Sequence, residues 1–80
     1  MTIIIEGLKI ENATKIINFV KYGKIKRIIP ERQNDDSYLF TLYIEDVGIS
    51  TDGKVITLVD NLTQLVIPPS MYDMIRIKRG

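Results

Sequence analysis

The chain has 80 residues, of which 45% are hydrophobic and 26% are charged, and its formal net charge is +1. This composition excludes an intrinsically disordered chain, and no apolar run is long enough to cross a bilayer. Cysteine and histidine are both absent, which excludes disulfides and thiolate metal sites and favours a reducing, cytoplasmic location. We therefore expect one small soluble domain spanning residues 1–80, whose isoleucine-rich composition would suit a thermophile.

The first quarter of the chain predicts a strand followed by a helix. Residues 2–6 form a β-branched run, which favours a strand at the centre of a sheet. From Asn12 to Val20, apolar residues recur at helical spacing, and Asn12 is a suitable N-cap. Gly23 follows where a helix commonly ends in the left-handed conformation.

The next segment predicts a β-hairpin. Residues 24–29 carry isoleucines among cations and stop at Pro30, which is typical of an edge strand. Residues 31–37 contain the turn-forming sequence Asn-Asp-Asp, and residues 38–45 are the strongest strand prediction in the chain. We expect these two strands to pair.

The second half of the chain is ambiguous. Residues 47–52 are expected to form a loop, and residues 54–67 show a helical stripe of apolar side chains. The same stretch is rich in β-branched residues, which would suit a hairpin that turns at Asp60-Asn61. The periodicity favours a helix, and the alternation over residues 73–79 predicts a half-buried last strand.

This order of elements predicts an α+β fold of the ferredoxin-like βαββαβ type. Such a fold has a four-stranded antiparallel sheet with two helices on one face and an open second face. If residues 54–67 form a hairpin instead, the alternative is a small OB-like β-barrel with one helix.

Two short segments make the chain resemble the RNA recognition motif family. Residues 3–8 are similar to the hexapeptide motif of that family's first strand, with Ile4 at a position that is usually aromatic. Residues 36–43 are similar to the octapeptide motif of its third strand. Aromatic residues occupy three positions of that motif: Tyr38, Phe40 and Tyr43. The sequence departs from the octapeptide at Asp36, Ser37 and Leu39, where the family has a basic residue, glycine and a small residue.

The resemblance implies a non-enzymatic domain that binds RNA or single-stranded DNA on its open sheet face. Exposed rings on the third strand would stack on bases, and cations on the edge strands would contact phosphates. Such a domain could act alone or within a larger ribonucleoprotein. The predicted nucleic-acid site comprises Ile4, Lys24, Lys26, Arg27, Tyr38, Phe40, Arg76 and Lys78.

Three alternatives remain open at this point. Alternation along the third strand also allows Phe40, Leu42 and Ile44 to face the core and Tyr43 to face outward. Lysines on edge strands also discourage aggregation without binding a ligand. A strand that is apolar on both faces further suggests a protein-interaction or regulatory module that docks or forms a homodimer through its sheet face.

Catalysis and cofactor binding have little support in the sequence. Without histidine or cysteine, the common general bases, nucleophiles and soft-metal ligands are missing. The acidic pairs Asp35-Asp36 and Glu45-Asp46 are adjacent in sequence, so within a strand each pair would point in opposite directions. No glycine-rich phosphate loop is present. We expect no enzymatic activity, no cofactor and no metal.

Overall fold

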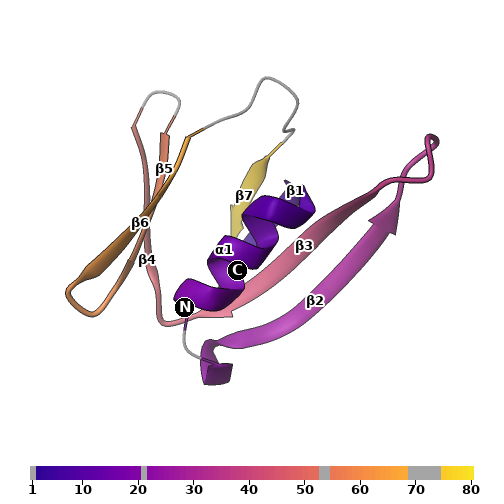
Figure 1. Cartoon of the computed structure of the whole chain (residues 1–80). Coiled ribbons are helices and arrows are strands. Elements are labelled where there is room, and N and C mark those ends of the chain that lie inside the picture. Colours follow the sequence, from indigo (N-terminus) through magenta and orange to yellow (C-terminus); the bar gives the residue numbers. More distant parts are fainter. Residues whose placement is uncertain (1, 21, 53–54, 69–74) are drawn as a thin grey trace.

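The computed structural model describes residues 2–20, 22–52, 55–68 and 75–80. Within these residues, one α-helix and a short 3-10 helix accompany seven strands in two antiparallel sheets (Figure 1). The elements are β1 (Thr2–Leu8), α1 (Ile10–Phe19), η1 (Tyr22–Lys24), β2 (Ile25–Arg32), β3 (Tyr38–Glu45), β4 (Gly48–Asp52), β5 (Val55–Asp60), β6 (Thr63–Ile67) and β7 (Arg76–Arg79).

The larger sheet has the strand order β2-β3-β1-β7. The predicted hairpin is confirmed, because β2 and β3 pair from Ile25 opposite Ile44 to Arg32 opposite Tyr38. The predictions of a central first strand and a basic edge strand are also confirmed. Helix α1 lies across one face of this sheet and contacts β1 and β3 (Figure 1). Within the described residues, no helix is long and apolar enough to cross a membrane.

Strand β1 contains an irregularity that adds one side chain to the core. Ile3 and Ile5 alternate into the core, and strict alternation would send Leu8 to the opposite face. The pairing of β1 with β3 shifts between Ile5 and Leu8, and Gly7 adopts a φ of 78° there. Glycine reaches this left-handed region without steric cost, so the bulge turns Leu8 inward, where it is fully buried.

Helix α1 forms where it was predicted, but its ends differ. It begins at Ile10 rather than Asn12, and its N-cap Lys9 makes no side-chain capping hydrogen bond. The helix ends at Phe19 because Val20 turns to extended backbone and places its side chain in the core. The prediction that Gly23 ends the helix in the left-handed conformation is wrong, since Gly23 lies in η1 and has no positive φ.

The second half of the chain overturns the predicted fold class. Residues 55–67 form β5 and β6 rather than a helix, and the two strands turn at Asn61 and Leu62 with a φ of 57° at Asn61. The ferredoxin-like βαββαβ prediction is therefore wrong, and the resemblance to the RNA recognition motif fails with it. The loop predicted for residues 47–52 is also wrong, because β4 pairs with β5 there.

The alternative with one helix fits the structure better. The hairpin that it required is present, with its turn at Asn61 and Leu62 rather than at Asp60-Asn61, and most described residues are in strands. The strands form two separate sheets, β2-β3-β1-β7 and β4-β5-β6. The predicted last strand is present as β7, while its expected first residues, Asp73 and Met74, lie outside the described residues.

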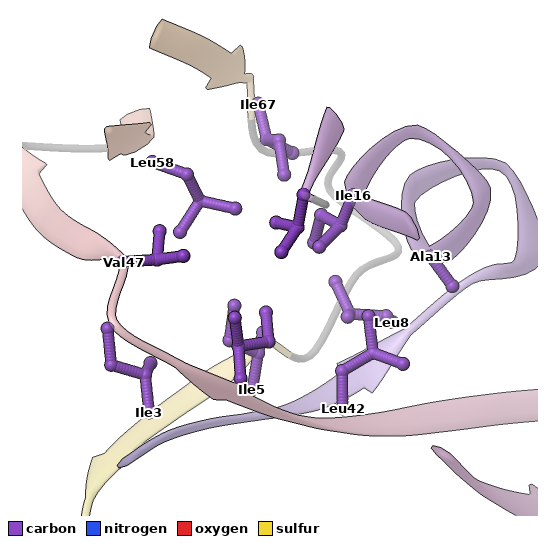
Figure 2. Close-up of a cluster of buried hydrophobic side chains, with 11 residues drawn as sticks. Ile3, Ile5, Leu8, Ala13, Ile16, Leu42, Val47, Leu58 and Ile67 are labelled. Carbon is purple, nitrogen blue, oxygen red and sulfur yellow. The ribbon is translucent and has the colours of Figure 1, made fainter. Parts of the chain in front are cut away.

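A single cluster of buried side chains joins α1 to both sheets (Figure 2). Leu58 and Ile67 contribute to it from the smaller sheet, and Val47 does so from the connection between β3 and β4. Its members are Ile3, Ile5, Leu8, Ala13, Ile16, Val20, Leu42, Ile44, Val47, Leu58 and Ile67. The smaller sheet therefore occupies part of the space over the larger sheet that a second helix was expected to fill.

The turn between β2 and β3 is held by Asp35. Its carboxylate accepts hydrogen bonds from the backbone N–H of Ser37, at 3.1 Å, and from the Ser37 hydroxyl. These bonds, the hydroxyl first, lower the pKa of Asp35 below its ordinary value, because they favour the ionised carboxylate. Asp36 takes the left-handed φ of 66° and forms an ion pair with Arg32.

We predict that Ser37→Ala raises the pKa of Asp35 toward its ordinary value, because the strongest of these hydrogen bonds is lost. A depressed pKa in the folded state stabilises the fold above the unfolded-state pKa, and this contribution is lost as the pH falls through the folded-state pKa. An NMR pH titration of the Asp35 carboxyl carbon measures the change. Ser37→Thr, which keeps a hydroxyl, is the control, and equal pKa values for Asp35 in Ser37→Ala and the native chain would contradict the assignment.

Candidate functional site

The orientation of β3 decides which aromatic side chains can contact a ligand on the face of the sheet away from α1. Leu42 and Ile44 are fully buried, and Phe40 packs against the same core. Tyr38 shares their side of the strand and is half exposed beyond the core. The prediction that Tyr38 and Phe40 form a stacking surface on the open face is therefore wrong, and the alternative register is the correct one.

The ring on the opposite side of β3 is Tyr43. It is partly exposed, and the guanidinium carbon of Arg27 lies 5.3 Å from the centre of its ring. Arg27 pairs directly with Tyr43 across β2 and β3, so the pleat places both side chains on one face. This distance is typical of a cation–π contact.

Four side chains form a row across this face, which we call the outer face. Tyr43 pairs with Arg27 of β2 on one side and with Ile4 of β1 on the other, and Ile4 pairs with Lys78 of β7. The order across the sheet is therefore cation, aromatic, aliphatic, cation. Three strand spacings of about 4.8 Å separate the two edge strands, so the row spans about 14 Å.

The outer face brings together half of the predicted site. Ile4, Arg27 and Lys78 belong to the row, and Arg76 lies in the neighbouring position of β7, opposite Glu6. Tyr43 is not among the predicted site residues. Only one of the two orientations that alternation along β3 allows places its ring outward, and the structure has that orientation.

Lys24 and Lys26 do not belong to this row. The ammonium group of Lys24 forms an ion pair with the carboxylate of Asp60 in the smaller sheet, and it also donates to the backbone oxygen of Asp46 at 3.3 Å. Lys26 lies at the irregular start of β2 and lines a hollow beside α1. Lys24 therefore contributes to the stability of the fold and is not part of a nucleic-acid site on the outer face.

Acidic side chains limit the positive charge of the outer face. The Glu6 carboxylate accepts from the ammonium group of Lys78 at 2.9 Å. Glu45 accepts a hydrogen bond from the Thr2 hydroxyl, which is the main reason that the pKa of Glu45 lies below its ordinary value. The cations thus lie at the two edges of the face, and Lys78 already has an anionic partner.

The described residues contain no group of three acidic side chains that could hold a metal ion. No protein family model, curated protein or solved structure matches this chain.

Proposed function

We propose that the chain is a non-enzymatic, cytoplasmic domain that binds RNA or single-stranded DNA on its outer face. The observation that carries this proposal is the row formed by Arg27, Tyr43, Ile4 and Lys78. An aromatic and an aliphatic side chain at the centre can contact the flat face of a base, and the flanking cations can contact phosphates on both sides.

The chemistry of the row predicts modest affinity and little sequence preference. Stacking of a base on Tyr43 is worth roughly 1–3 kcal/mol and tolerates every base, since every base has a π-face. The Arg27 guanidinium already lies over the ring, so a base would either displace it or contact the guanidinium itself. On the opposite edge strand, Arg76 and Lys78 add electrostatic attraction to the phosphates.

A fluorescence titration with a single-stranded hexanucleotide tests the proposal. We expect Tyr43→Ala to weaken binding by roughly fivefold to a hundredfold, which corresponds to the loss of one stacked base. Tyr38→Ala is the matched control, because it removes a ring of the same kind from the other side of β3. Equal affinities for the two variants, or no binding by the native chain, would refute the proposal.

The same titration at several salt concentrations tests whether the cations contact phosphates. Arg76→Glu should weaken binding. It should also reduce the slope of log K against log salt concentration by about 0.7, which is the value for one phosphate contact with a single strand. Lys15→Glu is the charge-matched control, because Lys15 is exposed on α1 rather than on the outer face. Equal salt slopes for these two variants would exclude Arg76 as a phosphate ligand.

A protein-interaction function is the second candidate. It is favoured by large apolar side chains that are exposed beside α1, on the opposite side of the sheet from the row. This second surface does not compete with the first, so a domain that assembles into a larger ribonucleoprotein could use both.

A further inference from the structure

Exposed apolar side chains gather on one side of the molecule, between α1 and the β2–β3 hairpin. Six large hydrophobic residues are exposed in the described part of the chain, and four of them lie on this side. These four are Ile10 (55% exposed), Ile17 (37%), Ile28 (49%) and Tyr38 (50%). Concentration of apolar surface in one place commonly marks an interaction site, whereas single exposed side chains are ordinary.

The four side chains line one surface. Ile10 and Ile17 are seven residues apart, so they share a flank of α1, and the exposed Thr14 between them is uncharged. Ile28 and Tyr38 lie on the inner side of the hairpin, which faces α1. One hollow is lined by Ile17 and Ile28, and a second one by Ile10, Tyr38 and Phe40. We call this surface, from Ile17 and Ile28 to Ile10 and Tyr38, the lateral trough.

The edge of β2 limits how a partner can fill the trough. Pro30 has no N–H group, and lysine and arginine side chains lie near the start of the strand. These features discourage addition of another strand to a sheet edge. A partner is therefore expected to pack with its side chains rather than extend the sheet.

The two ends of the trough carry different charges. Lys26 lines the hollow near the C-terminal end of α1, whose described lining includes no acidic residue. Glu11 and Asp35 line the hollow near the N-terminal end of α1, together with Lys9. An antiparallel alignment of two such troughs would bring the basic end of each copy against the more acidic end of the other.

We infer that the lateral trough binds a second copy of this chain, with a two-fold axis that aligns the two troughs antiparallel. A two-fold interface uses the same patch on both subunits, and this patch matches itself in both charge and apolar character. The half-exposed Tyr38 would be the main anchor, because tyrosine is enriched among the residues that dominate interface energies.

The size of the trough predicts a weak, reversible dimer. A stable interface buries about 800 Å² on each partner, which is a large share of the 5521 Å² that the chain exposes. The trough is about as long as the ten-residue helix α1, which is about 15 Å. This length is short for an interface of that area. The dimer would leave the outer faces of both copies on its outside, because the trough and the outer face lie on opposite sides of the larger sheet.

Sedimentation equilibrium over a concentration series tests the inference with the full chain. We expect the native chain to dimerise at high concentration and Ile17→Glu to remain monomeric. Leu62→Glu is the matched control and should still dimerise, because Leu62 is fully exposed at the turn of the smaller sheet, far from the trough. A native chain that stays monomeric at all concentrations would overturn the inference, as would equal dimerisation of the two variants.

Charge reversal tests the antiparallel alignment without introducing a charge into the apolar surface. Lys26→Glu and Glu11→Lys should each weaken the dimer about tenfold, because each creates two symmetric like-charge pairs. The double variant should restore the native dissociation constant, since the pairs are re-formed with their signs exchanged. Circular dichroism confirms that each variant is folded, and additive rather than compensating effects in the double variant would overturn the alignment.

Discussion

Replacement of Leu58 by alanine is expected to lower the free energy of unfolding by about 3 kcal/mol, within the range measured for large-to-small changes in cores. Leu58 is fully buried and reaches the common core from β5 in the smaller sheet (Figure 2). Its side chain points into the common core, so its truncation leaves a void between the sheets that neither can easily close. Urea unfolding followed by circular dichroism measures the loss.

The region of the fold that Leu58→Ala destabilises is as informative as the size of the stability loss. Hydrogen exchange should accelerate most in β4, β5 and β6, because these strands attach to the rest of the fold through few core side chains. Val66→Ala is the control, since Val66 is exposed on β6 and its truncation should cost less than about 0.5 kcal/mol. Equal costs for the two variants would contradict the shared core.

The predicted helix over residues 54–67 failed for a physical reason. Its apolar residues occur at helical spacing, but they also occupy both faces of two short strands: Ile56 and Leu58 face the core, while Val55 and Val59 do not belong to it. With apolar residues on both faces, the alternation typical of a strand is hidden. The β-branched side chains and the turn at Asn61 were the better guide, because they report local conformational preference.

About half of the candidate site could be predicted from the sequence. Local patterns identified β1, α1 and the β2–β3 hairpin, and with them the positions of Ile4, Arg27 and Lys78 on one sheet. They could not decide which side of β3 faces α1, because both sides carry aromatic and aliphatic residues. That choice depends on tertiary packing, and a change of one residue in register exchanges every side chain between the two faces.

The ion pair between Lys24 and Asp60 could not be predicted either. Its partners are 36 residues apart, and the basic character of the segment around Lys24 predicts a phosphate contact for this lysine instead. In the structure, Asp60 is only 4% exposed in β5, and Lys24 reaches it from the short helix before β2. The pair therefore connects the smaller sheet to the beginning of the hairpin.

Lys24→Met is expected to lower the free energy of unfolding by about 3 kcal/mol, because it removes the ammonium group that pairs with the buried carboxylate of Asp60. The estimate lies at the lower end of the usual range, since Lys24 itself is 24% exposed. For a small domain this is a large part of a total stability of about 5–15 kcal/mol. The midpoint of urea unfolding should fall accordingly, with little change in its slope.

Lys78→Met provides the matched control, because it removes the same group from the exposed ion pair with Glu6, where Lys78 is 61% exposed. A surface pair of this kind contributes about 0–1 kcal/mol, so the control should unfold close to the native midpoint. Adding Asp60→Asn to Lys24→Met should then recover part of the stability, because a buried carboxylate that has lost this ammonium group is replaced by a neutral amide of nearly the same shape. Equal costs for Lys24→Met and Lys78→Met, or further destabilisation by the second substitution, would show that the charge of Asp60 is compensated by other groups and that Lys24 does not hold the two sheets together.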